Sequence, residues 1–271
     1  MKKHYALMLF GLLLFSECAN PAAEVIPQTQ RAETATPLPP TDTPEPTETA
    51  SPLPPTNTPE PTATATISYT PTPEIKTEQI EVPYEDRIIR GTLVGDGEIA
   101  VVLAPMFGEN RSSWIAFAKH LASLGYTALA FDFPGFGASS GEFNYTATTF
   151  DALAVIDFLL DQGYERIVCM GASVGAGACY EAAVLRPNLA GLVIISAPVE
   201  TTSEEAAILL MPKLLVTGDE PDVKGQMKEN FQLLLAPKQF ELINEKRHGT
   251  EMINTGDELR DMLVEFLESL P

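Results

Sequence analysis

The chain has 271 residues and a formal net charge of −20 at pH 7, with 37 acidic and 17 basic residues. So negative a balance argues against binding to nucleic acid and against docking on anionic lipid by charge, because both surfaces repel it. The length leaves room for one domain of ordinary size together with additional segments.

The first segment in chain order, residues 1–18, has the pattern of a secretory signal. Two lysines precede an apolar stretch from Tyr5 to Phe15, which is too short for a membrane-spanning helix of about 20 residues. Cys18 resembles the lipidated cysteine of a bacterial lipoprotein signal, although Glu17 stands where a small residue is usual. We therefore expect an exported protein, either secreted or anchored by a lipid at Cys18 to the outer face of the cytoplasmic membrane or the cell surface.

Residues 19–75 have the composition of a linker. The sequence PLPPTDTPEPTETAS begins at Pro37, and a close copy of it begins at Pro52. Such a composition offers almost nothing to bury, so no core can offset the entropy lost on ordering. Proline favours an extended backbone of about 3.1 Å per residue. We expect a disordered Pro/Thr-rich stalk that holds the following domain away from a surface.

Residues 76–271 alternate between strand-like and helical patterns. Strands are predicted at residues 79–82, 88–94, 99–103, 126–131, 167–170, 191–195, 214–217 and 239–243, and helices at 114–124, 150–160 and 251–270. This alternation predicts a largely parallel sheet covered on both faces, with the earliest strands as an antiparallel edge. The segment between Ala197 and Met211 is too short to form a cap domain.

The motif Gly171-Ala172-Ser173-Val174-Gly175 directly follows one of these predicted strands. This G-x-S-x-G pattern is the signature of a serine held on a tight turn between a strand and a helix. Side chains at the two glycines would collide around the strained backbone of such a turn. Because sites in open sheets form at the carboxyl ends of strands, Ser173 is the candidate nucleophile.

A serine hydroxyl needs a base, and histidine is the usual one near neutral pH. Of the three histidines, His4 lies in the signal and His120 lies beside Lys119, off the apolar stripe of its helix. His248 lies just beyond the last predicted strand and before the last helix, which makes it the candidate base.

The base in turn needs an acid that fixes its tautomer, and the acid precedes the histidine in the chain order expected for this scaffold. The candidates lie in Gly218-Asp219-Glu220-Pro221-Asp222, after the strand that ends at Thr217. Asp222 is the first choice because it starts a new element after Pro221, and Asp219 is the fallback. Either aspartate could instead cap the following helix.

These segments together resemble the α/β-hydrolase family over nearly all of residues 76–271. The resemblance is carried by the G-x-S-x-G motif, by the stretch from Asp132 to Ser139 after a central strand, by residues 218–222 and by His248-Gly249. It implies an α/β-hydrolase fold, with a mostly parallel sheet of about eight strands, helices on both faces and no cap domain. It also implies Ser173 as nucleophile, His248 as base and Asp222 as the orienting acid, although Asp222 stands one residue further from Gly218 than is common in the family.

The loop expected to stabilise the oxyanion departs from the family pattern. The family often has His-Gly after the third strand, whereas this chain has Ala104-Pro105-Met106-Phe107-Gly108. Backbone N–H groups are the donors in such a loop, and a proline has none to give. The N–H of Phe107, or that of Met106 if the loop turns earlier, would pair with the N–H of Val174.

The cysteines of the domain, Cys169 and Cys179, flank the predicted turn on its strand and its helix. We expect both to fill space in the core rather than to form a disulfide. The chemistry outlined above needs no metal and no cofactor, and none is expected.

The sequence thus predicts a serine hydrolase that cleaves small-molecule carboxylic esters through an acyl-enzyme. The same triad could act on thioesters or peptides. A different class of function, a catalytically silent surface binding domain on the same scaffold, is kept open by the unusual Pro105-Met106 loop.

Overall fold

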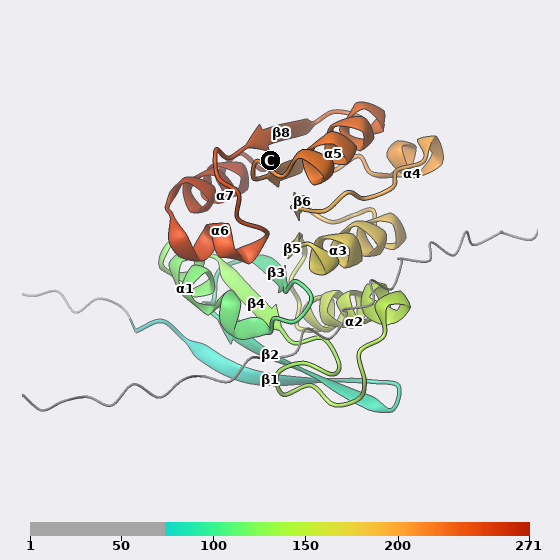
Figure 1. Cartoon of the computed structure of the whole chain (residues 1–271). Helices are drawn as coiled ribbons and strands as arrows, with labels where there is room; N and C mark the ends of the chain where they lie inside the picture. Colours follow the sequence, from blue (N-terminus) through green and yellow to red (C-terminus); the bar gives the residue numbers. More distant parts are fainter. Residues whose placement is uncertain (1–73) are drawn as a thin grey trace, which may run out of the picture. The chain divides into compact units, whose positions relative to one another are not determined.

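The computed structural model describes residues 74–271 (Figure 1). The predictions made for the signal, for Cys18 and for the Pro/Thr-rich repeats lie outside the described residues.

The described residues form one eight-stranded sheet with the strand order β1-β2-β4-β3-β5-β6-β7-β8. The strands are β1 (Thr77–Tyr84), β2 (Arg87–Val94), β3 (Ile99–Ala104), β4 (Thr127–Phe131), β5 (Arg166–Ala172), β6 (Gly191–Ile195), β7 (Lys213–Thr217) and β8 (Lys238–Leu242). Strand β2 runs antiparallel to both β1 and β4, and the other neighbours are parallel. The predicted parallel sheet with an antiparallel edge is therefore confirmed.

Helices cover both faces of this sheet (Figure 1). They are α1 (Ile115–Ser123), α2 (Thr148–Asp161), α3 (Val174–Leu185), α4 (Ser203–Ile208), α5 (Pro221–Leu233), α6 (Thr250–Thr255) and α7 (Glu258–Glu268). One buried apolar cluster lies between the sheet and helices α2, α3 and α5, and a second lies between the opposite face and α1, α6 and α7. The segment between β6 and β7 contains only the short α4, in line with the expectation that it is too short for a cap domain.

One helix boundary differs from the prediction. Residues 251–270 were expected to form a single helix, but the structure divides them into α6 and α7. Gly256 separates the two with an extended backbone, at φ −154° and ψ 167°. Glycine loses more backbone freedom in a helix than any other residue, so the helix ends there readily.

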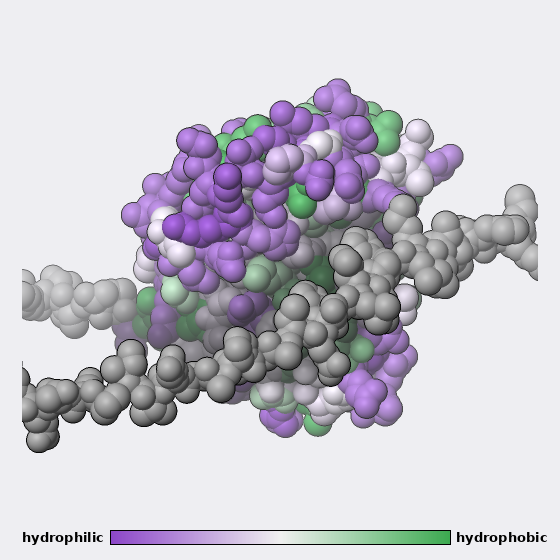
Figure 2. All heavy atoms as spheres, in the orientation of Figure 1, coloured by the Kyte–Doolittle hydropathy of each residue, from purple (hydrophilic) through white to green (hydrophobic). Residues whose placement is uncertain are grey.

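The sequence pattern of the central strands follows from this double cover. Every residue of β4, β6 and β7 is buried, whereas β1 at the edge alternates between exposed and buried residues. Strands buried on both faces need continuous apolar runs, which is why these segments could be located from sequence. The outer surface is mostly hydrophilic over α6 and α7 in the view of Figure 2.

Lys213, the first residue of β7, is a fully buried exception to the apolar pattern. Its Nζ donates hydrogen bonds to the carbonyl oxygens of Leu209, at 2.7 Å, and Met211, at 2.6 Å. Burial lowers the pKa of this ammonium to about 8. The side chain thus donates to carbonyl groups just after α4, next to the first residue of β7.

The expectation that Cys169 and Cys179 only fill space is wrong, because the two form a disulfide between β5 and α3. The turn at Ser173 folds α3 back along β5, which brings the two Cα atoms to 5.5 Å. That separation lies within the range that a disulfide can bridge. The bond closes the short loop that carries Ser173.

A buried carboxyl group on α2 should make stability depend on pH. Asp151 is buried, and its Oδ1 lies 3.5 Å from an Nη atom of Arg87. Burial raises the pKa of Asp151 from 3.8 to about 6, and Arg87 opposes that rise only in part. Between about pH 4 and pH 6 the folded state therefore binds more protons at this site than the unfolded state, so ionisation at rising pH lowers the free energy of unfolding.

We expect Asp151→Asn to remove this dependence. In urea unfolding from pH 4 to pH 7, the free energy of unfolding of the native protein should fall by up to about 3 kcal/mol relative to that of the variant. Each unit by which the pKa of the folded state exceeds that of the unfolded state corresponds to about 1.4 kcal/mol. Parallel stability curves for the two proteins would contradict the prediction.

Candidate active site

Ser173 lies on a strained turn between β5 and α3. Its backbone has φ 50° and ψ −115°, a conformation that residues other than glycine seldom adopt. A Cβ atom at Gly171 would overlap the carbonyl of Gly175, and one at Gly175 would overlap the carbonyls of Ala104 and Pro105. The two glycines of the motif therefore allow α3 to start directly beside the loop that follows β3.

His248 lies in the loop between β8 and α6, and its partner is a glutamate. Its Nδ1 is 2.8 Å from Oε2 of Glu220, the residue that immediately precedes α5. Asp222, the predicted acid, lies exposed in the first turn of α5. Asp219, the fallback, forms an ion pair with Lys224, which lowers the pKa of that aspartate. The structure thus corrects the predicted pairing of His248.

The physical reason for this correction is where α5 begins. Pro221 occupies the start of the helix, so Glu220 is the last residue with an extended backbone, at φ −106° and ψ 98°. Asp222 is already part of the helix and is exposed there. The sequence contained a signal for Glu220. This scaffold accepts glutamate as well as aspartate as the acid, and Glu220 lies in the same short stretch as both aspartates.

The loop that carries His248 packs directly onto the end of β7. The N–H of Asp219 donates to the carbonyl of Glu245 at 2.5 Å. A Cβ atom at Gly218 would lie 2.6 Å from the carbonyl oxygen of Glu245 and 2.8 Å from that of Arg247. Gly218 is therefore required for the histidine loop to approach β7 this closely.

The end of β6 connects the serine turn with the histidine loop. The N–H of Ser173 donates to the carbonyl of Ile195, the last residue of β6, at 2.8 Å. The next residue, Ser196, is buried, has φ 50°, and accepts a hydrogen bond on its Oγ from the N–H of Gly249 at 3.2 Å. Two consecutive residues thus hold the candidate nucleophile and the neighbour of the candidate base.

Gly249, which follows His248 in the chain, packs against the residue before Ser173. Its φ is 55°, and an added Cβ atom would lie 3.0 Å from Sδ of Met106 and 3.2 Å from Cβ of Ala172. Ala172 directly precedes Ser173, so the histidine loop contacts both the turn and the loop after β3. Gly249, the neighbour of His248, thus lies against both Met106 and Ala172, the residue before Ser173. The structure also adds Glu220 and Ser196, which the sequence analysis missed.

Replacing Ser196 with alanine should lower kcat for the ester cleavage expected from the sequence by about 10- to 100-fold with KM within about twofold, because small displacements of a base cost rate rather than binding. Steady-state kinetics on p-nitrophenyl butyrate would measure both. The matched control is Ser140→Ala, which also removes a hydroxyl that accepts a backbone N–H, from Ile88 at 2.8 Å. An equal loss in the control, or no loss at Ser196, would contradict the prediction.

The loop after β4 is organised by Asp132, which is buried. Its carboxylate accepts hydrogen bonds from the N–H of Arg111 at 2.7 Å and from the N–H of Ala138 at 2.8 Å, and it pairs with the guanidinium of Arg111. A Cβ atom at Gly137 would overlap this carboxylate. Asp132 thus ties the loop after β3 to the loop after β4, which is a structural task.

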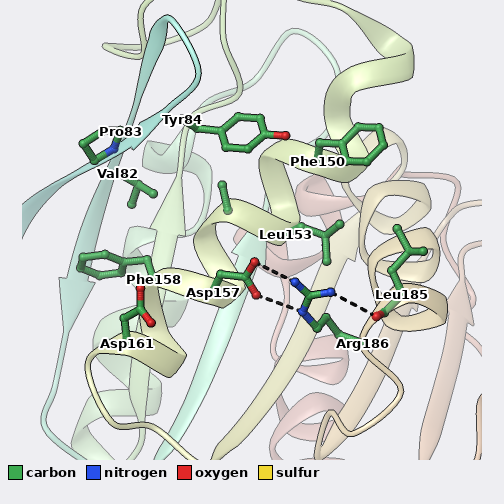
Figure 3. A pocket seen from close by; sticks show the side chains of 11 residues that line it. Val82, Pro83, Tyr84, Phe150, Leu153, Asp157, Phe158, Asp161, Leu185 and Arg186 are labelled. Carbon is green, nitrogen blue, oxygen red and sulfur yellow. Dashed lines mark hydrogen bonds and ion pairs between the residues drawn. The ribbon is translucent and has the colours of Figure 1, made fainter.

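Two hollows among residues 74–271 are relevant to the site, although neither is lined by Ser173. An apolar groove of about 570 Å³ is lined by the end of β1, by α2 and by the end of α3, and the ion pair between Asp157 and Arg186 crosses its wall (Figure 3). A groove of about 490 Å³ lies beside the histidine loop and is lined by polar residue types, among them Glu109, Arg247 and Glu251. Among residues 74–271, no group of three or more His, Cys, Asp or Glu side chains could hold a metal ion. No helix in the same range has both the length and the hydropathy to cross a bilayer.

The sequence and structure were compared with known proteins. A family model described as alpha/beta hydrolase fold matches residues 99–237, just over half of the chain. A predicted CIB-like hydrolase from Thermoplasma acidophilum is similar in structure, with a TM-score of 0.63 and 20% identity over 73% of this chain and 100% of that one. None of the curated proteins that were searched matches the sequence.

Two further solved structures have the same arrangement. A dienelactone hydrolase from Anabaena variabilis matches with a TM-score of 0.64 and 18% identity, over 72% of this chain and 98% of that one. An esterase from Pyrococcus furiosus matches with a TM-score of 0.63 and 17% identity, over 72% of this chain and 93% of that one. At these identities the likeness is one of fold.

Proposed function

The chain belongs to the α/β-hydrolase fold family, and we propose that it is a serine hydrolase that cleaves carboxylic esters through an acyl-enzyme. The observation that carries the proposal is the contact of 2.8 Å between Nδ1 of His248 and Glu220, in a loop that packs against the residue preceding Ser173. A nucleophile on a strained turn, a base and an acid that orients it are the parts this chemistry needs.

The mechanism follows from the tautomer that Glu220 selects. A carboxylate that accepts a hydrogen bond from Nδ1–H leaves Nε2 of His248 unprotonated and able to accept the proton of Ser173. Oγ of Ser173 then attacks the ester carbonyl, and His248 returns the proton to the departing alcohol. Water, activated by the same imidazole, releases the acid from Ser173 and restores the enzyme.

The negative oxygen of the tetrahedral intermediates needs donors beside Ser173. We assign this task to the N–H of Val174, at the first position of α3, and to that of Phe107 or Met106. The support is the close packing of the loop after β3 against Gly175, in the first turn of α3. One such donor is typically worth about 2.7–4 kcal/mol of barrier.

A fluorophosphonate probe tests the proposal on the full chain, because it reacts with a serine only when the base has activated it. Peptide mass spectrometry should locate the label on Ser173, and Ser173→Ala should remain unlabelled. A folded native protein that takes up no label would overturn the proposal and favour a catalytically silent binding domain. A labelled protein that cleaves thioesters or peptides but not esters would move the substrate class while leaving the triad in place.

We further propose that the enzyme is exported and anchored at Cys18 or secreted. The sequence pattern of residues 1–18 supports this, and so does the disulfide between Cys169 and Cys179, because disulfides persist in oxidising compartments. Mass spectrometry of the mature N-terminus would show a lipidated Cys18 or a different first residue.

A further inference from the structure

Three phenylalanine rings of the loops after β3 and β4 form a cluster, named here the phenylalanine cluster. Phe107 comes from the loop after β3, and Phe136 and Phe143 come from the loop after β4. The ring centroids are 5.4 Å apart for Phe107 and Phe136, 5.2 Å for Phe107 and Phe143, and 5.1 Å for Phe136 and Phe143. Each ring thus contacts both others, at the spacing that aromatic pairs prefer.

The cluster is both exposed and rigidly supported. Phe107 is 60% exposed, although its two partners are half-buried against the core. A Cβ atom at Gly135 would lie 2.6 Å from the backbone nitrogen of Phe143, so the loop after β4 is folded tightly on itself. An exposed aromatic ring on a fixed apolar support is the kind of surface that binds an apolar ligand.

The cluster borders the site from the side opposite the base. Phe107 directly follows Met106, which the histidine loop contacts at Gly249. Phe136 and Phe143 pack against the apolar cluster under α2 and α3, whereas Met106 packs against the one under α1, α6 and α7. The phenylalanine cluster therefore extends from the serine turn toward one face of the sheet, and the histidine loop approaches from the other.

The chemistry of ester cleavage assigns these two sides. The base must give its proton to the oxygen of the departing alcohol, so the alcohol lies toward His248 and the acyl group lies away from it. The surroundings match, because polar residue types line the groove beside the histidine loop, among them Glu109, Arg247 and Glu251. The surface over α6 and α7 is also mostly hydrophilic (Figure 2).

We infer that the phenylalanine cluster binds the acyl group, and that the preferred substrates are esters of acids with an aromatic or other bulky apolar group. This inference rests on the proposed function, since it assumes attack by Ser173 and protonation of the alcohol by His248. It places the apolar part of the substrate on Phe107, Phe136 and Phe143, and the smaller or more polar alcohol beside the histidine loop.

The test keeps the alcohol constant and varies the acid. We expect kcat/KM of the full chain for p-nitrophenyl 3-phenylpropionate to exceed that for p-nitrophenyl acetate by about tenfold or more, because filling an apolar pocket typically discriminates by about 10- to 200-fold. Phe136→Ala should reduce this ratio about tenfold, through a lower kcat/KM for the phenylpropionate. Phe136→Leu, which keeps most of the apolar volume, should fall between the two.

The matched control is Phe150→Ala, which removes a half-exposed ring from the groove of Figure 3 rather than from the phenylalanine cluster. Its acyl preference should equal that of the native protein. Equal turnover of both esters by an enzyme that the fluorophosphonate labels would overturn the inference alone, as would an unchanged ratio in both Phe136 variants. Absence of the label and of all ester turnover would overturn the proposed function itself.

Discussion

Replacing Ser173 with alanine is expected to lower kcat/KM for a carboxylic ester by about three to four orders of magnitude, which corresponds to about 4–5.5 kcal/mol of transition-state stabilisation. In the proposed mechanism, the acyl-enzyme forms on Oγ of Ser173, so the variant has no atom that can replace it. The remaining rate would come from the oxyanion donors and from binding alone. Steady-state kinetics on p-nitrophenyl butyrate would measure the loss. Circular dichroism at equal protein concentration would show that the variant is folded.

Ser140→Ala is the control for this prediction as well, since Ser140 is exposed in the loop after β4 and its hydroxyl accepts a hydrogen bond from the N–H of Ile88. It should retain turnover within about twofold, as surface substitutions usually do. Retention of more than about a tenth of the native rate in Ser173→Ala would exclude Ser173 as the nucleophile.

A double variant asks whether Ser173 and His248 act as one unit. If the imidazole serves only to activate the hydroxyl, then Ser173→Ala combined with His248→Ala should be no slower than Ser173→Ala by itself, within about threefold. Losses that multiply would mean that His248 contributes by a separate route.

Much of the fold follows from local patterns in the sequence. The apolar runs at β3 to β7 are continuous because helices cover both faces of the sheet, and a run of that kind can be recognised without knowing its neighbours. The turn at Ser173 could also be foreseen, since the steric demands of Gly171 and Gly175 act over five consecutive residues. Local physics determines these features, so local sequence reveals them.

The remaining features depend on how distant segments meet. The disulfide between Cys169 and Cys179 requires that α3 fold back along β5, and neither cysteine signals this by itself. The role of Ser196 arises only once the loop after β8 closes over the end of β6 and brings Gly249 within reach of its hydroxyl. The break at Gly256 was not predicted because the apolar spacing continues across it, although a glycine there favours the end of a helix.

The choice of the acid illustrates the same limit at the scale of one helix turn. Asp219, Glu220 and Asp222 lie within four consecutive positions, and all follow the same strand. Which of them faces His248 depends on where α5 begins and how far the histidine loop extends, neither of which the residue types disclose. The predicted Asp222 and the observed partner Glu220 therefore differ by two positions and in one methylene group.

Replacing Glu220 with glutamine should lower kcat/KM by at least about 100-fold, and toward 10⁴-fold if the wrong tautomer of His248 becomes dominant. Asp222→Asn and Asp219→Asn are the matched controls, because each removes a neighbouring carboxylate from the same stretch, and each should retain activity within about threefold. The same kinetic assay on p-nitrophenyl butyrate serves for all three variants. Loss in Asp222→Asn with retention in Glu220→Gln would restore the assignment made from sequence.

The large effect expected at Glu220 follows from how its carboxylate is held. The side chains of His248 and Glu220 are only 33% and 22% exposed, so solvent screens their interaction less than it screens a surface pair. Oε2 of Glu220 contacts Nδ1 of His248. The other carboxylate oxygen, Oε1, is buried and has no hydrogen-bond partner among the described residues. In the proposed mechanism, a neutral amide in that position could neither stabilise the imidazolium that forms as Ser173 attacks nor require Nδ1 to carry the proton, so both functions of the acid would be lost together.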